Sequence, residues 1–128
     1  MGKPILNGRQ IPTRYGTSIV KQEKLNINNK DYEITCVSMG NPHCVVFCND
    51  VEKLDLKTIG PLFERHEVFP ERINTEFVEI LDESHFKMRV WERGSGETLA
   101  CGTGACAVAV VACERGLCKK GEDITVKV

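Results

Sequence analysis

The stretch that decides the fold is Gly104–Arg115, GACAVAVVACER, followed by Gly116. Most of these residues are strong to fair helix formers, and a glycine after a basic residue is typical of a helix C-terminus. On such a helix every face from Ala105 to Cys113 is apolar. A helix without a polar stripe must be surrounded by protein. We therefore expect strands to wrap around this helix.

Strand patterns precede the helix. Apolar residues alternate with polar ones on both sides of a polar turn at residues 28–31, which predicts a β-hairpin with one solvent-exposed face. The nearly continuous apolar run His43–Cys48 predicts a buried strand entered through a turn. Thr75–Leu81 and Phe86–Trp91 alternate around a second polar turn and predict another hairpin. Its inward-facing candidates are Phe77, Ile80, Met88 and Val90.

Between the two hairpins, apolar residues at helical spacing run from Leu56 to His66, but Gly60 and Pro61 interrupt them. Because proline suits the first turn of a helix, we expect a short helix that begins near Pro61. The glycine- and proline-rich residues 1–20 indicate an extended lead-in. The predicted class is α+β, a small mixed-strand barrel wrapped around one central apolar helix, forming a single domain over residues 1–128.

Composition and charge argue against several classes of function. The chain has 128 residues with 17 Lys+Arg against 18 Asp+Glu, so it suits one domain and has no basic footprint for nucleic acid. Its longest apolar run is about half of the roughly 20 residues that cross a bilayer, which argues against a membrane partner. Seven cysteines without a secretory signal argue against a disulfide scaffold and for a cytoplasmic protein.

The stretch Trp91–Gly104 combines a strand, a glycine-rich loop and a helix start. The first amides of a helix lack partners and carry a partial positive charge, so Gly102 and Thr103 could hold a carboxylate or phosphate. The same field lowers the pKa of a neighbouring thiol, which makes Cys101 a candidate thiolate. The alternative, a small buried cysteine, is favoured for Cys106 inside the apolar helix.

Nucleotide and metal motifs fail on inspection. The glycines at positions 94 and 96 fit neither a P-loop nor the dinucleotide fingerprint. The cysteine spacing lacks the close pair typical of a zinc site, so no metal is expected.

Three motifs are more specific. Met39–His43 (MGNPH), Arg72–Glu79 (RINTEFVE) and Glu92–Ala105 (ERGSGETLACGTGA) resemble the diaminopimelate epimerase family, and the likeness extends over nearly the whole chain. It implies two similar halves, each a barrel around a helix, that face each other across a cleft. It also implies inversion of one α-carbon of diaminopimelate by two cysteines, without pyridoxal phosphate or metal, in bacterial lysine and peptidoglycan precursor synthesis.

This chain resembles the second half of such an enzyme. It carries the second cysteine, Cys101, but not the first-half motif, a cysteine followed by Gly, Asn and Gly, and the closing strands after Val128 are not in the sequence. The resemblance therefore implies that the N-terminal half is a partner and that the isolated chain is inactive. It leaves open whether the full-length enzyme is a homodimer.

The resemblance also implies roles at the helix start. Cys101 would be one of the two bases. The amides of Gly102 and Thr103 would hold the α-carboxylate as negative charge develops on the substrate. Capping of the helix is an equally good and compatible role for Thr103.

The resemblance also implies roles for five residues outside the helix. Arg93 would bind the distal carboxylate, and Glu92 would accept from an ammonium group or tune the thiol pKa. Asn41 and Asn74 would bind the distal amino-acid end, and His43 would tune thiol protonation. The alternatives are an exposed Glu92–Arg93 ion pair, turn roles for both asparagines and a core role for the histidine.

Two other functions remain open. A cysteine-based racemase of the same fold, similar to proline racemase, would use the same thiol chemistry. Arg93 with Asn74 argues against proline, which lacks a second carboxylate. A non-catalytic anion- or nucleotide-binding module would use only the helix start.

Overall fold

The computed structural model describes residues 3–99, 102–116 and 125–127. Within them a mixed sheet is combined with two α-helices and one short 3₁₀ helix, so the α+β class is confirmed. The elements in chain order are β1 (Glu23–Ile27), β2 (Lys30–Ser38), β3 (Pro42–Phe47), η1 (Val51–Lys53), α1 (Leu56–Glu64), β4 (Asn74–Asp82), β5 (His85–Glu92), β6 (Gly96–Thr98), α2 (Gly102–Glu114) and β7 (Thr125–Lys127).

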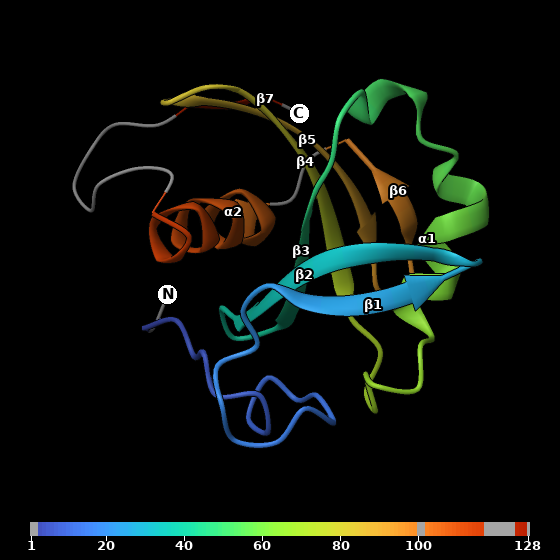
Figure 1. Ribbon diagram of the computed structural model, residues 1–128, viewed down its shortest axis with the longest axis vertical. Helices are drawn as coiled ribbons and strands as arrows, with labels where there is room; N and C mark the ends of the chain where they lie inside the picture. Colours follow the sequence, from blue (N-terminus) through green and yellow to red (C-terminus); the bar gives the residue numbers. More distant parts are fainter. Residues whose placement is uncertain (1–2, 100–101, 117–124, 128) are drawn as a thin grey trace.

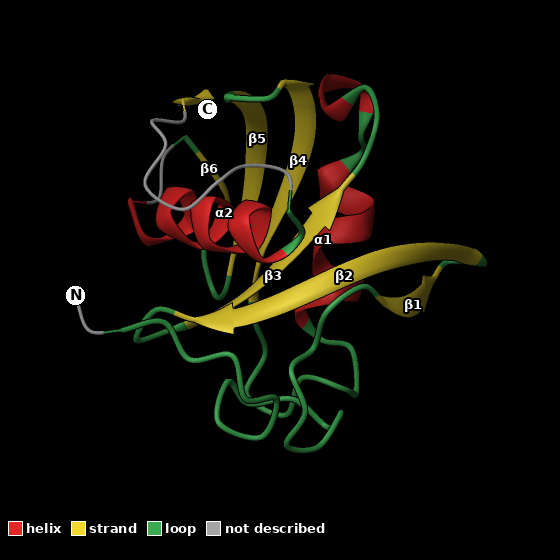
Figure 2. Ribbon diagram, turned by 60° about the vertical axis from the view of Figure 1, so that its left-hand side comes forward, coloured by secondary structure: helices red, strands yellow, loops and turns green. Residues whose placement is uncertain are grey.

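The strands form one open sheet in the order β1-β2-β3-β4-β5-β6, and β7 pairs with β5. Neighbours are antiparallel except for the parallel pairs β3–β4 and β5–β7. The two α-helices cover opposite faces of this sheet (Figures 1 and 2). Both faces of the central strands are therefore buried, which explains the nearly continuous apolar run in β3.

The two faces have separate cores. On the α1 face, the ring of Phe63 packs edge-on against Tyr32 and against Phe77, with centroid distances of 5.2 Å in each pair. On the α2 face, the small residues of α2 pack against aliphatic and aromatic strand residues. The buried members of this second core are Val37, Val45, Val78, Phe86, Met88, Ala107, Val108, Val111 and Ala112.

Both predicted hairpins are confirmed. β1 and β2 are joined by Asn28 and Asn29, whose positive φ values of 53° and 66° suit the tight turns that match the strand twist. β4 and β5 form the second hairpin. One of its inward candidates is wrong, because Ile80 is 45% exposed. The strand register shifts between Ile80 and Asp82, next to that residue.

The prediction for α1 is wrong in its start. The helix begins at Leu56 and continues through Gly60 and Pro61. Proline here removes only the bond to the carbonyl of Lys57, a residue that is exposed to solvent. A Cβ on Gly60 would lie 2.3 Å from the Trp91 ring, so glycine permits the close approach of α1 to β5.

The predicted apolar helix is confirmed as α2, which ends at Glu114, and Gly116 shortly after it has a positive φ of 74°. One side of α2 is buried on the sheet, whereas Ala105, Cys106, Ala109 and Val110 on the other side are half-exposed. The described strands therefore form an open sheet beside the helix instead of surrounding it. The barrel stays a prediction.

The lead-in folds back on the sheet. Ile5 bridges Ser38 at the end of β2, and Ile11 and Val20 are buried in the α1-side core. Among the helices of the described ranges, none has the length and apolar character needed to cross a membrane.

Candidate active site

The predicted site residues on or beside the strands, namely Asn41, His43, Asn74, Glu92 and Arg93, lie at one edge of the sheet. β3 and β4 run parallel and begin there, while antiparallel β5 ends there. In this register His43 lies opposite Asn74, and Thr75 lies opposite Trp91. Three sequence motifs that are far apart in the chain are thus brought together.

Asn74 fastens the three strands at this edge. Its Nδ2 donates to the Pro42 carbonyl at 2.8 Å, and its Oδ1 accepts from the Arg93 backbone N–H at 2.8 Å. The side chain is 6% exposed. Each end of the amide therefore makes a backbone hydrogen bond, and the substrate-binding role of Asn74 stays a prediction.

A chain of side chains links the sheet edge to α2. Nε2 of the fully buried His43 lies at hydrogen-bond distance, 2.9 Å, from Asn41 Oδ1. Asn41 in turn donates from Nδ2 to Thr103 Oγ1 at 3.4 Å. Thr103 is half-buried in the first turn of α2, next to the exposed Gly102. The structure therefore brings Asn41, His43 and the start of α2 together.

Glu76 extends this chain, although no sequence motif predicted a role for it. Its Oε2 lies 2.9 Å from His43 Nδ1, and neither side chain is exposed. Burial raises the pKa of Glu76 well above its usual range, with a further contribution from the negative charge of Glu92. Burial also lowers the pKa of His43 to about 4, although Glu92 opposes this shift. The alternation of strand side chains indicates that Glu76 is buried, because Glu76 and the buried Val78 lie on the same face of β4.

Glu92 and Arg93 bond away from each other. Glu92 Oε1 accepts from the Thr98 hydroxyl at 2.8 Å, and Arg93 donates from a terminal guanidinium nitrogen to the Glu71 carbonyl at 3.1 Å. Both side chains are half-buried. In the structure they do not serve as a simple surface ion pair.

Glu64 on α1 holds the turn that follows Arg93. Glu64 is 5% exposed, and its carboxylate accepts from the Trp91 indole at 2.8 Å and from the Gly94 amide at 3.0 Å. Arg72 donates to it as well, at 3.0 Å. No local sequence pattern points to Glu64, because its partners lie on other elements.

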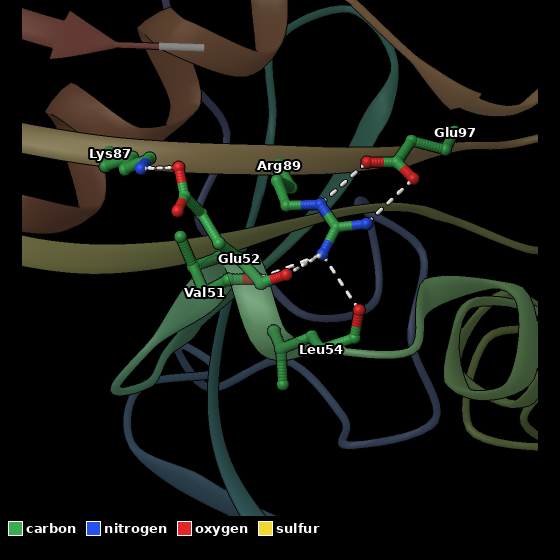
Figure 3. Close-up of polar contacts among 6 residues, drawn as sticks. All are labelled: Val51, Glu52, Leu54, Lys87, Arg89 and Glu97. Carbon is green, nitrogen blue, oxygen red and sulfur yellow. Dashed lines mark hydrogen bonds and ion pairs between the residues drawn. The ribbon is translucent and has the colours of Figure 1, made fainter.

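Arg89 holds the strand that leads toward the helix start (Figure 3). Its guanidinium makes two parallel bonds to Glu97 of β6, at 2.8 and 2.9 Å. The remaining terminal nitrogen donates to the carbonyls of Val51, Glu52 and Leu54. The bonds from Arg89 also lower the pKa of Glu97. Beside this cluster, Lys87 pairs with the Glu52 carboxylate.

The predicted nucleophile, Cys101, lies outside the described residues, as does Cys118. Gly102, directly after Cys101 in sequence, is the first residue of the thirteen-residue helix α2. Among the described cysteines, burial raises the pKa of Cys44 and brings that of Cys48 to about 11. These two thiols stay protonated at neutral pH.

The remaining described cysteines differ in exposure. Cys36 is buried opposite Cys44 in the β2–β3 pair, whereas Cys106 and Cys113 are half-exposed on α2 instead of filling the core completely. In the described ranges no group of three or more His, Cys, Asp or Glu residues is placed to hold a metal ion.

Comparison with known proteins agrees with the motifs. The family model described as diaminopimelate epimerase matches residues 35–128. A diaminopimelate epimerase of Microcystis aeruginosa is 55% identical over 122 residues, which cover 94% of this chain and 43% of that protein. One from Acetivibrio thermocellus is 51% identical over 120 residues, with 94% and 43% covered.

A plant relative is equally similar. The chloroplastic diaminopimelate epimerase of Oryza sativa subsp. japonica is 55% identical over 125 residues, 91% of this chain and 35% of that protein. The chain thus spans less than half the length of these curated relatives. The motifs, the mixed sheet with its helices and the matches over most of the sequence lead to one conclusion: this chain belongs to the diaminopimelate epimerase family.

Proposed function

We propose that this chain supplies one half of the active site of a diaminopimelate epimerase, with Cys101 as one of two catalytic bases. The observation that carries the proposal is the convergence of Asn41, His43, Asn74, Glu92 and Arg93 at one sheet edge, linked to the first turn of α2 by the Asn41–Thr103 hydrogen bond. Because Cys101 directly precedes α2, a thiolate there is within the field of the helix N-terminus.

The reaction is a 1,1-proton transfer. The Cys101 thiolate removes the α-proton and becomes a thiol, while the electron pair of the broken C–H bond stays on the α-carbon. A thiol on the opposite face, from the N-terminal half of the enzyme, donates its proton to that carbon and becomes a thiolate. The centre is inverted and the total number of protons on the two cysteines is unchanged, with the same exchange in reverse for the other isomer.

Substrate binding divides between the two ends of diaminopimelate. The amides of Gly102 and Thr103 hold the α-carboxylate, where negative charge increases as the proton leaves. Arg93 binds the distal carboxylate through its guanidinium, and Glu92 accepts from an ammonium group or shifts the thiol pKa. Asn41 and Asn74 bind the distal amino-acid end, and His43 tunes thiol protonation.

The complete fold follows the same proposal. In it, strands supplied by the rest of the enzyme cover the half-exposed side of α2 and close a barrel, and the N-terminal half completes the cleft. The isolated chain then lacks the second base and cannot invert the α-carbon. The product serves lysine and peptidoglycan precursor synthesis, in the cytoplasm for a bacterial enzyme.

The test combines this chain with the N-terminal half of a relative that carries the partner cysteine. We expect the mixture to exchange the α-hydrogen of diaminopimelate with solvent in heavy water and to interconvert the LL and meso isomers. Cys101→Ala should abolish both activities. Cys106→Ala, on α2, is the matched control and should retain them. No exchange by a mixture that forms a stable complex would contradict the proposal.

Substrate identity needs a second comparison. Arg93→Ala should weaken the binding of diaminopimelate far more than that of an amino acid with a single carboxylate. Equal losses, or racemisation of proline by the wild-type mixture, would favour a related racemase. Saturable nucleotide binding without any α-hydrogen exchange would favour a non-catalytic module.

A further inference from the structure

The hydrogen bonds from β4 to α2 have a definite direction. Asn41 presents Oδ1 to His43 and Nδ2 to Thr103. An amide oxygen only accepts, so Nε2 of His43 must carry a proton. If the imidazole is neutral, Nδ1 is then an acceptor, and the Glu76 carboxyl 2.9 Å away must be the donor.

The surroundings of Glu76 favour this neutral arrangement. The carboxyl and the imidazole are both fully buried, and Glu76 Oε1 has no hydrogen-bond partner within the described residues. An orphan oxygen costs less free energy on a neutral acid than on a carboxylate. The raised pKa of Glu76 and the lowered pKa of His43 agree with it.

Glu76 thereby determines which way the Asn41 amide faces. If the carboxyl were ionised beside a neutral imidazole, it would attract the proton to Nδ1 of His43. The bare Nε2 would then face Asn41 Oδ1 as two acceptors, so the amide would turn over. Its donor would leave Thr103 and the start of α2.

We propose that Glu76 is a positioning residue of the epimerase site, which donates a hydrogen bond to His43 and so holds the Asn41 amide with its N–H groups toward the start of α2. The proposal rests on the proposed function for its effect on substrate, because Asn41 is there a binding residue. Within the described residues, the charged and titratable groups that face the pair are Glu92 and Arg93 from β5 and its end, and Cys44 from β3.

The first test is ¹⁵N NMR of the imidazole nitrogens in the 128-residue chain near pH 7. The chain has three histidines, so the variants His66→Gln and His85→Gln assign the His43 signals. We expect a neutral imidazole protonated at Nε2. A neutral imidazole protonated at Nδ1, or an imidazolium, would overturn the proposal.

Substitutions of Glu76 then test whether its hydrogen-bond donor, and not only the shape of its side chain, determines the tautomer of His43. Glu76→Gln retains an N–H donor toward Nδ1 and should keep the Nε2–H form, whereas Glu76→Leu should give a mixture of tautomers. Glu79→Gln, farther along the same strand, is the control and should leave the His43 signals unchanged. An unchanged tautomer in the leucine variant would overturn the proposal.

The second readout is kinetic and uses this chain with the N-terminal half. Glu76→Leu should raise KM for diaminopimelate about tenfold, the loss of one oriented hydrogen bond, with a smaller change in kcat. Glu76→Gln should restore KM to within about twofold of the wild type. A fall in kcat alone would contradict a positioning role. Because the NMR experiment needs no substrate, it tests Glu76 even if the wild-type mixture shows no exchange.

Discussion

The two faces of the sheet are both buried, but different kinds of residue pack on them. On the α1 face, three aromatic rings meet edge to face around Phe63, and large apolar residues fill the space between strands and helix. On the α2 face, the helix contributes alanines and valines, and the strand residues beneath include the buried pair His43 and Glu76. The first face supplies stability, whereas the second carries polar groups toward the candidate site.

The difference teaches that a buried carboxyl can be tolerated where its partner is fixed by the neighbouring strand. His43 and Glu76 lie on the neighbouring parallel strands β3 and β4, and Nδ1 of His43 is 2.9 Å from Oε2 of Glu76. We expect substitutions on the α1 face to change stability and substitutions of this pair to change its pH dependence.

The largest expected effect is on the α1 face. Phe63→Ala should lower the free energy of unfolding by about 3–5 kcal/mol, because it removes a buried ring that contacts two others. Val111→Ala on α2 removes two carbons and should cost about 1–2 kcal/mol. Urea denaturation measures both, with exposed Leu62→Ala as the control. Equal losses of unfolding free energy in Phe63→Ala and Val111→Ala would contradict this difference between the two faces.

A smaller effect is expected where α1 approaches β5. Gly60→Ala places a methyl group against the Trp91 ring and should cost about 1–3 kcal/mol through overpacking, although alanine is the better helix former. Lys57→Ala, exposed on the same helix, should change stability by less than about 0.5 kcal/mol. Stabilisation by Gly60→Ala in the same denaturation assay would contradict the close contact.

The pH dependence tests the polar pair on the other face. Folded Glu76 keeps its proton while the unfolded chain loses it near pH 4.3, so this group makes stability fall as the pH rises. His43, with its pKa lowered to about 4, has the opposite effect up to about pH 6.5. The two contributions offset each other below about pH 6.5. Above it, stability should fall by up to about 1.4 kcal/mol per pH unit.

Glu76→Gln should remove this fall. Urea midpoints between pH 6.5 and 8 measure it in a range below the ordinary pKa of the cysteine thiols. Glu79→Gln, on the same strand, should keep the wild-type slope. An equal slope in wild type and Glu76→Gln would show that the folded chain does not hold a proton on the pair.

Local patterns predicted much of this fold, and long-range contacts account for the rest. The hairpins, the buried strand β3 and helix α2 follow from alternation, turn residues and apolar composition, which act over a few neighbours. The close approach of α1 to β5 depends on Gly60 facing the Trp91 ring, a contact that no local pattern contains. The barrel prediction assumed that every apolar face of α2 is covered by this chain.

The candidate site was likewise predicted in part from local motifs and depends in part on contacts between distant elements. Asn41, His43, Asn74, Glu92 and Arg93 were found through motifs, and the structure places them at one sheet edge. Their spatial arrangement depends on the register of β3, β4 and β5, which the sequence does not reveal. Glu64, Glu76 and Arg89 act on residues from other elements, so their roles appear only when those elements are packed.

We propose above all that Cys101 is reactive because it directly precedes α2 in the sequence. The most direct test is the rate at which iodoacetamide alkylates each cysteine near neutral pH, followed by mass spectrometry of the peptides. We predict that Cys101 reacts faster than Cys106 and Cys113, which are half-exposed on α2. Equal rates for the three thiols would contradict the claim.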